Sequence, residues 1–416
     1  QALDSLTTSF GYSTAVGYQA LSGATTAYGN TAMGVDALKA IVTTHNNTAF
    51  GRGAGATSTG SNSVMIGYDA GSKGGTGTTA VGYDTLSSSS LSATYLTAVG
   101  STALKNNTTG TNNTALGTDG LLDNTTGAGN TGVGMNAGIR NSTGSSNTSL
   151  GYNAGAKVTT GSGNTIIGRD AGAAAGPATT NYNTFVGYYA GRFAPGPNNT
   201  LIGYKAGYGV SGSTTTAAQY MVAVGEHALT GITTGTENTA VGGNAGFATT
   251  SGYRNTYLGY GAGDALTTGT NNTIIGNGSD ASAVGVSNEI TLGNASIATL
   301  RCQVQTISSL SDRRDKKDIE ELPLGIDFIN TLKPVKFTWN MRDGAKIGQQ
   351  EAGFIAQDLD EAQIDAGAED YLSLVLKNNP EKLEASYGKL VPVLVKAVQE
   401  LSNEIEKLKK EIKNGR

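Results

Sequence analysis

Ser311 and Lys316, five positions apart, are the pair of residues in this chain best suited to covalent chemistry. A lysine amine that burial keeps uncharged can take the proton of a serine hydroxyl and so make it a nucleophile. The residues between them include Asp312 and Arg314, and the stretch "SDRRDKK" lies where the chain changes composition. The alternative interpretation is a solvated run of charges, the more frequent meaning of such a stretch.

The chain consists of two parts with different compositions that meet at Ser311. Residues 1–310 hold 11 of the 28 Lys and Arg and 12 of the 32 Asp and Glu, whereas the last 106 residues hold 17 and 20. Of the 61 glycines, 54 precede Ser311. We therefore expect two kinds of structure, with the candidate pair at their junction.

Composition excludes several classes of function. A net charge of −4 does not favour nucleic acid or an anionic membrane as a partner. We find no signal peptide and no apolar run of about 18 residues, so no membrane insertion is predicted. One cysteine, Cys302, and two histidines, His45 and His227, argue against a disulfide framework and a zinc site, and we predict no cofactor. Because the chain begins with Gln1, we expect a fragment or a processed product.

The first 300 residues are built from one repeated unit, marked by a glycine that ends pentapeptides of the "NTAVG" type. Successive copies of this glycine are mostly seventeen positions apart. The repeat glycines are Gly17, Gly34, Gly51, Gly67, Gly82, Gly100, Gly117, Gly134, Gly151, Gly168, Gly187, Gly203, Gly225, Gly242, Gly259 and Gly276, and "NEITLG", ending at Gly293, is a degenerate last copy.

Each position of the repeat has a structural meaning. The residue before the glycine is apolar, as at Val16 and Met33, and Thr usually stands two positions earlier, so we expect a short strand with a buried apolar residue. The glycine suits a positive φ, the Ala three positions later allows close approach, and the Asn that begins the pentapeptide can stack into an amide ladder.

Stacking of these units predicts a β-solenoid, because a unit this short cannot enclose its own core. With one rung every ~4.8 Å, about seventeen rungs would span on the order of 80 Å. The rungs are thin and rich in Ala, so we expect several chains to pack side by side. The "GNTAVGxxAG" pattern resembles the β-roll repeats of trimeric adhesin heads and of phage tail-fibre proteins, which implies a homotrimer.

Two columns of the repeat could bind ligands. The position two after the glycine could form a metal-binding ladder, although a turn-capping residue repeated in every rung is the simpler interpretation. It holds Asp36, Asp69, Asp84, Asp119, Asn136, Asn153, Asp170 and Asn244. The position after the glycine could form an exposed aromatic stripe for sugars or a packed tyrosine ladder, and we favour the ladder. It holds Tyr18, Tyr68, Tyr83, Tyr152, Tyr188, Tyr204 and Tyr260.

The last 106 residues predict a small α/β segment followed by a long helix. Apolar spacing from Ile326 predicts a helix that Pro334 ends, and a strand alternating at Val335, Phe337 and Trp339 follows. "EAGFIAQDL" predicts a second strand that leads into a helix. An a/d heptad seam then predicts a coiled coil; its residues are Val391, Leu394, Val398, Leu401, Ile405, Leu408 and Ile412. By themselves, β-branched residues at a and Leu at d favour a dimer, which conflicts with a trimer.

Four motifs, "SDRRDKKDI", "LKPVKFTW", "GFIAQDL" and "YGKLVPVLVKAVQEL", resemble the C-terminal intramolecular chaperone domain of endosialidases, phage tail spikes and tail fibres. The family pattern Ser-Asp-x-Arg-x-Lys falls on Ser311, Asp312, Arg314 and Lys316 without a gap. The resemblance implies that Ser311 is the nucleophile, that Lys316 is its general base and that Arg314 supports them. It also implies a cut between Ser311 and Asp312 after three chains have registered and folded.

The sequence therefore predicts a host-recognition protein of a phage tail, located in the virion and assembled as a homotrimer. Residues 1–300 would form a receptor-binding solenoid, 301–310 a connector, and 311–416 a self-cleaving chaperone with a coiled-coil helix at 388–414. Its enzymatic activity would be a single cleavage of its own backbone by a serine–lysine endopeptidase. Its partners would be a host cell-surface receptor, expected to be a glycan, and other tail proteins, with rung insertions near residues 180 and 215 as candidate receptor contacts. The alternatives are a trimeric adhesin of a bacterial cell surface and a tail-spike glycan depolymerase.

Overall fold

The computed structural model describes residues 11–88, 92–173, 180–193, 196–210, 218–297, 299–303, 309, 311–341 and 346–415. The chain divides into two compact units, Gln1–Leu292 and Gly293–Arg416. The first unit ends with the last repeat strand, some residues before the change in composition at Ser311.

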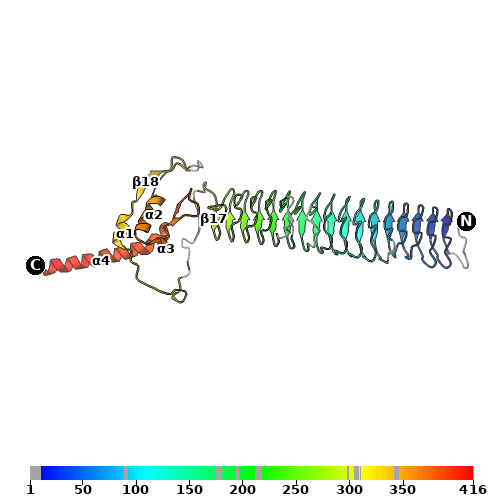
Figure 1. The fold of residues 1–416 in the computed structure, drawn as a ribbon, viewed down its shortest axis with the longest axis horizontal. Helices are drawn as coiled ribbons and strands as arrows, with labels where there is room; N and C mark the ends of the chain where they lie inside the picture. The colour runs from blue at the N-terminus through cyan, green and yellow to red at the C-terminus, as the bar shows by residue number, and fades with distance from the viewer. Residues whose placement is uncertain are drawn as a thin grey trace. The chain divides into compact units, whose positions relative to one another are not determined.

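The first unit is a parallel β-solenoid, which Figure 1 shows as one stack of short arrows. Its described part holds seventeen strands of three residues, and each pairs in parallel with the strand of the next rung. Equivalent positions face each other, as in the pairing of Thr14 with Thr31 and of Ala15 with Ala32. This pairing confirms the predicted solenoid, in which one repeat of the sequence forms one rung. The strands are β1 Thr14–Val16, β2 Thr31–Met33, β3 Thr48–Phe50, β4 Val64–Ile66, β5 Thr79–Val81, β6 Thr97–Val99, β7 Thr114–Leu116, β8 Thr131–Val133, β9 Thr148–Leu150, β10 Thr165–Ile167, β11 Thr184–Val186, β12 Thr200–Ile202, β13 Val222–Val224, β14 Thr239–Val241, β15 Thr256–Leu258, β16 Thr273–Ile275 and β17 Ile290–Leu292.

The repeat glycines turn the chain at the end of each strand in a conformation that other residues adopt with strain. From Gly17 to Gly276 all sixteen have φ between 126° and 142°. They also stack on one another, since a Cβ added to Gly117 would lie 2.7 Å from the backbone carbon and oxygen of Gly134. Both the positive φ and the close approach explain why glycine is required at this position.

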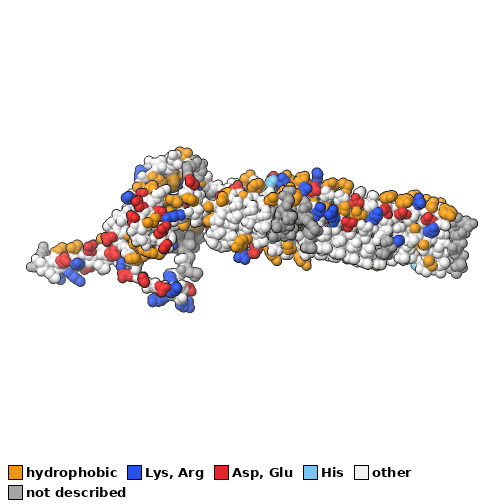
Figure 2. All heavy atoms as spheres, in the orientation of Figure 1, with side chains coloured by type: hydrophobic (Ala, Val, Ile, Leu, Met, Phe, Trp, Pro, Cys, Tyr) orange, Lys and Arg blue, Asp and Glu red, His pale blue; other side chains and the backbone are white. Residues whose placement is uncertain are grey.

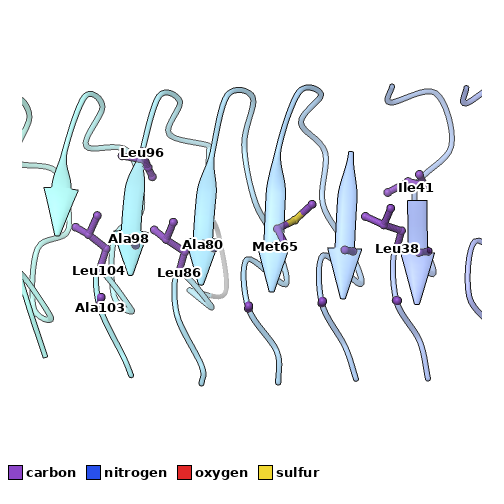
Figure 3. Close-up of a cluster of buried hydrophobic side chains, with 14 of the residues drawn as sticks. Leu38, Ile41, Met65, Ala80, Leu86, Leu96, Ala98, Ala103 and Leu104 are labelled. Carbon is purple, nitrogen blue, oxygen red and sulfur yellow. The ribbon is translucent and has the colours of Figure 1, made fainter. Parts of the chain in front are cut away.

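The strand faces are the reverse of those predicted. The middle residue of each strand points inward, and Ala32, Ala49 and Met65 are fully or almost fully buried. The apolar residue before the glycine points outward instead, and Val16 and Phe50 are 51% and 55% exposed. The prediction of a buried apolar residue at this position is therefore wrong. The interior of a rung is filled by these middle residues, which are as different in size as Ala32 and Tyr257, together with Ala and Leu from the following turn. Figure 3 shows several of these side chains, among them Met65 and Leu86.

A column of buried asparagines links successive rungs, which confirms the expected amide ladder. The backbone N–H of Asn147 donates to Oδ1 of Asn130 at 2.9 Å, and that of Asn130 donates to Oδ1 of Asn113 at 2.8 Å. Most of these side-chain amides also donate to a carbonyl in the next rung, as Nδ2 of Asn130 does to Gly144 at 2.8 Å. These bonds satisfy backbone groups that the turns leave without a strand partner.

The second unit contains two small antiparallel sheets and a long helix. A 3-10 turn η1 (Arg313–Asp315) precedes α1 (Ile326–Thr331), the β18–β19 hairpin (Val335–Thr338 and Gln350–Gly353) and α2 (Ala356–Asp365). The remaining elements are α3 Glu369–Leu372, β20 Val375–Leu376, β21 Glu384–Ala385, the 3-10 turn η2 Tyr387–Leu390 and α4 Val391–Asn414. The core includes Phe328 of α1, Leu359 of α2 and Val393 of α4, so the start of the long helix is anchored in the unit.

The long helix has an apolar seam that no other described element covers. α4 begins at Val391, directly after the 3-10 turn η2, and runs for 24 residues. All seven residues of the predicted heptad seam are exposed, among them Leu401 at 42% and Ile412 at 68%. Only Val393 and Ala397, on another side of the helix, are buried.

Candidate functional site

The η1 turn brings Ser311 and Lys316 together. The turn reverses the chain, so that the side chain of Lys316 reaches Ser311. The backbone N–H of Lys316 closes the turn by donating to the carbonyl of Arg313. Nζ of Lys316 donates to Oγ of Ser311 at 2.7 Å. A proton can therefore pass directly between the two groups, because the distance is that of a hydrogen bond.

Asp312 and Arg314 hold the turn that makes this contact possible. Asp312 caps the turn by accepting the backbone N–H of Arg314 at 2.8 Å, and its carboxylate also binds the Arg314 guanidinium at 2.6 Å. The hydrogen bonds from Arg314 hold the pKa of the Asp312 carboxyl below its usual value. Neither side chain contacts Ser311 or Lys316 in the interactions of the described residues, so both support the turn rather than the reacting atoms.

The candidate pair is fully on the surface of a single chain. Every residue from Ser311 to Glu320 is exposed. An amine accepts a proton only when it is uncharged, and burial is the usual means of favouring that form. The described residues thus supply the required hydrogen-bonded geometry, but they do not enclose the lysine in apolar side chains.

Comparison with known proteins agrees with the resemblance for part of this unit. Residues 311–368 match the family model described as the chaperone of endosialidase. The match begins at Ser311 and includes the turn, α1, the β18–β19 hairpin and α2. It does not reach the solenoid or α4. No curated protein and no solved structure shows significant similarity to the chain.

The outward faces of the solenoid strands form a long surface that we call the apolar face. It consists of the residues before the repeat glycines, and its exposed members include Val16, Met33, Phe50, Ile66, Leu116, Leu150, Ile202, Val241, Leu258, Ile275 and Leu292. Figure 2 shows hydrophobic side chains along one edge of the solenoid for most of its length, with Lys, Arg, Asp and Glu side chains between them. The first residue of each strand, which is Thr in most rungs, lies on the same face. Sequence reasoning found this column but assigned it to the inside, because alternation does not say which face is buried.

The Asp and Asn residues two positions after the glycines occupy turn positions. All eight have φ between 51° and 60°, the left-handed region that Asp and Asn tolerate. They also bind one another along the stack, as Nδ2 of Asn136 does to Oδ1 of Asn153 at 2.9 Å, and Nδ2 of Asn153 to Oδ1 of Asp170 at 3.0 Å. Backbone conformation and stacking thus explain this column, and no group of three metal-ligating side chains occurs among the described residues.

The tyrosines after the glycines form an exposed stripe, since each keeps at least about a third of its surface accessible. Tyr68 and Tyr83 stack at 5.4 Å between ring centroids, and Tyr188 and Tyr204 lie 5.7 Å apart in a tilted arrangement. The predicted packed ladder is therefore found only at these pairs among the described residues. The sequence insertions at 174–179 and 211–217 lie outside the described residues. None of the helices that are described is long and apolar enough to cross a membrane.

Proposed function

We propose that residues 311–416 are a self-cleaving chaperone that assembles three copies of the solenoid into a tail-fibre or tail-spike shaft. The observation that carries this proposal is the 2.7 Å hydrogen bond between Lys316 and Ser311, in a segment that matches the endosialidase chaperone family. The assembled shaft would then recognise a glycan receptor on the host surface and attach to other tail proteins in the virion.

The cleavage follows from the chemistry of the pair. The uncharged amine of Lys316 takes the proton from the Ser311 hydroxyl, and the oxygen attacks the carbonyl carbon of a peptide bond between Ser311 and Asp312. The carbon–nitrogen bond breaks, and the proton held by Lys316 passes to the nitrogen of Asp312, which leaves an ester on Ser311. Water then hydrolyses the ester and restores the attacking hydroxyl. The N-terminal fragment of the cut chain ends in a carboxylate at Ser311, and its C-terminal fragment begins with an amine at Asp312.

This bond can be cut only between chains. The Ser311 hydroxyl would close a strained β-lactone ring if it attacked the carbonyl of its own residue. A hydroxyl from a neighbouring chain meets no such constraint. We therefore infer that each Ser311 attacks the bond of another chain in the same assembly. Attack on the preceding carbonyl would instead close a relaxed oxazolidine ring within one chain, and the released fragment would then begin with Ser311.

The exposure of the pair supports a cleavage that waits for assembly. Residues 311–320 are exposed in the single chain, and the described residues do not enclose Lys316 in apolar side chains. Neighbouring chains would bury the lysine when they bring the scissile bond to the serine. Cleavage would then occur only after the chains have assembled. Removal of the chaperone would make the assembled shaft kinetically stable.

Two exposed apolar surfaces support assembly from several chains. The apolar face extends along the solenoid, and the heptad seam extends along α4. A soluble chain rarely leaves contiguous apolar surface of this extent uncovered. Stacked rungs of similar sequence can pair in shifted registers, so a bundle formed first by the second unit would set the register of the solenoids.

The test compares the intact chain with Ser311→Ala and Lys316→Met on a denaturing gel. We expect the wild type to release a fragment of about a quarter of the mass, and both variants to stay whole. Ser309→Ala and Lys317→Ala are matched controls, because each removes a neighbouring residue of the same type and should leave cleavage intact. Cleavage that persists in Ser311→Ala would exclude the serine as the nucleophile.

A mixed assembly tests attack between chains. A tagged Ser311→Ala chain, coexpressed with the wild type, should be cut in part, because a wild-type serine can reach its bond. Mass spectrometry of the released fragment should find Asp312 as its first residue. A tagged chain that stays whole in verified mixed assemblies, with fragments that begin at Ser311, would show cleavage within one chain.

A further inference from the structure

Aromatic and basic side chains gather in the turns that follow β11 and β12. The group consists of Tyr188, Tyr189, Arg192, Tyr204, Lys205 and Tyr208, which we call the aromatic–cationic patch. Tyr188 stacks on Tyr189 at 3.8 Å between ring centroids, and the Arg192 guanidinium lies 4.2 Å from the centre of the Tyr189 ring. Nζ of Lys205 lies 5.1 Å and 5.4 Å from the rings of Tyr204 and Tyr208. Tyr188 and Tyr204 lie 5.7 Å apart between ring centroids, so the side chains of these two adjacent rungs form one surface.

The patch has an excess of positive charge. Residues 165–210 hold three cations, Arg169, Arg192 and Lys205, but one acid, Asp170, in a chain whose net charge is −4. Asp170 is already paired with Arg169 at 3.4 Å. Neither Arg192 nor Lys205 has a carboxylate partner among the described residues, and Nε of Arg192 is buried without a hydrogen-bond partner. The Arg192 guanidinium and the Lys205 amine thus carry positive charge that no described carboxylate pairs with, which favours an anionic ligand.

The same rungs depart from the regular repeat in sequence. The ladder bond from Asn183 to Asn164 spans 19 positions and that from Met221 to Asn199 spans 22, whereas the regular bond from Asn147 to Asn130 spans 17. The solenoid needs no such insertion in order to stack. The coincidence of irregular rungs with the patch therefore indicates that this region is adapted to something other than the fold.

We propose that the aromatic–cationic patch binds an acidic saccharide, a sugar chain that carries carboxylate or phosphate groups. Tyr188 and Tyr204, both more than a third exposed, offer ring faces on which the C–H faces of sugars can stack. Arg192 and Lys205 supply the charge for the acidic groups, and arginine can bind a carboxylate or phosphate through two parallel hydrogen bonds. This inference rests on the proposed function in host recognition and names the site and the class of ligand.

The alternative use of the patch is an interface between copies of the chain. In an in-register assembly the same rungs lie at the same level, so these cations would meet aromatic rings and other cations rather than carboxylates. Desolvated charges without partners are strongly unfavourable. The apolar face, by contrast, has no such charges to bury, and it is the better surface for contact between chains.

The test is an array of immobilised neutral and acidic saccharides, probed with the assembled protein and with the double variant Arg192→Ala/Lys205→Ala. We expect binding to acidic members only, at least a tenfold loss in the double variant, and weaker binding at roughly 0.5 M salt than at about 0.15 M, because salt screens ionic contacts. Arg140→Ala is the matched control, since Arg140 is an exposed arginine three rungs before the patch and should leave binding unchanged. Tyr204→Ala should also weaken binding, because it removes a stacking surface but no charge.

The outcomes separate this inference from the proposed function. Sedimentation and the denaturing gel first establish that each variant assembles and is cleaved like the wild type. If the double variant still bound acidic saccharides, the glycan site would lie elsewhere and the proposed role of the patch would be refuted, while the proposal of host recognition would stand. Binding of neutral saccharides alone, or binding of host cells without any acidic saccharide, would overturn it likewise. If the wild type bound neither saccharides nor cells, both the patch and host recognition would be refuted, whereas the chaperone proposal would still depend on the cleavage assay.

Discussion

Loss of one asparagine from the buried ladder should loosen the solenoid locally. In Asn130→Ala the backbone N–H of Asn147 loses its acceptor, Oδ1 of Asn130 at 2.9 Å, inside the rung. The carbonyl of Gly144 loses one donor but keeps the amide of Asn141 at 2.9 Å. The variant thus leaves one buried donor unsatisfied, which costs about 2 kcal/mol.

Hydrogen exchange measures this cost where it arises. Because each rung contacts only its neighbours, the loss should appear in the adjacent strand β9 rather than in the whole solenoid. About 2 kcal/mol corresponds to a roughly 30-fold faster exchange of the protected β9 amides, if exchange follows local opening. Mass spectrometry of peptides that cover 148–151 can detect a change of this size.

The control is Asn106→Ala, an exposed asparagine whose side chain binds Asp123 at 3.2 Å on the surface of the stack. Its loss leaves no buried group unsatisfied, so exchange should change by about twofold or less. If the β9 amides of Asn130→Ala exchanged at the wild-type rate in a protein that still assembles, the ladder would not stabilise the rungs and the reasoning would be wrong.

Three further predictions concern the backbone, a charge network and the helix seam. Gly117→Ala should lower the melting temperature by several degrees, because Gly117 has a φ of +133° and an added Cβ would lie 2.7 Å from backbone atoms. The control is Gly120→Ala, whose added Cβ would have its nearest contact at 3.4 Å. This control should change the melting temperature little. Burial raises the pKa of Asp360, but hydrogen bonds from Lys377 and Gln363 outweigh this and hold it below its usual value. The stability that results is present above the unfolded pKa and is lost as the pH falls through the folded one. Acid titration of unfolding should therefore show a weaker loss of stability in Asp360→Asn than in the wild type. Leu401→Glu should reduce association in sedimentation without unfolding the second unit, since Leu401 is exposed in the single chain, and unchanged association would show that the α4 seam is not an interface.

The periodicity of the sequence predicts the solenoid well, because every rung repeats the same physical requirements. Repeat glycines such as Gly117 need a positive φ, and the asparagines need partners in the next rung, so their spacing reveals the stacking directly from the sequence. The inside and the outside were not predictable in the same way. Val16 and Ala15 alternate as in any strand, and residue size does not decide which position is buried, because Tyr257 lies inside while Leu258 after it is exposed.

The candidate site shows the same division between local and distant causes. The separation of Ser311 and Lys316 predicts their contact because a single short turn, capped by Asp312, joins them. Their exposure agrees with the alternative interpretation of a solvated run of charges, whereas any burial of the pair would depend on residues far away in the chain or in other chains. The aromatic–cationic patch was missed for a related reason: Arg192 and Lys205 belong to different repeats, and only the stacking of two rungs places them on one surface.

The pairing of each rung with its immediate neighbours has an evolutionary consequence. A rung can be duplicated or deleted by recombination between repeats, because the new neighbours present the same glycine, alanine and asparagine columns. Each such event would change the reach of the solenoid by about 4.8 Å and leave the C-terminal unit untouched. The length of the solenoid can therefore change in evolution independently of assembly and of recognition. The distance that the binding surface reaches can change while the fold stays the same.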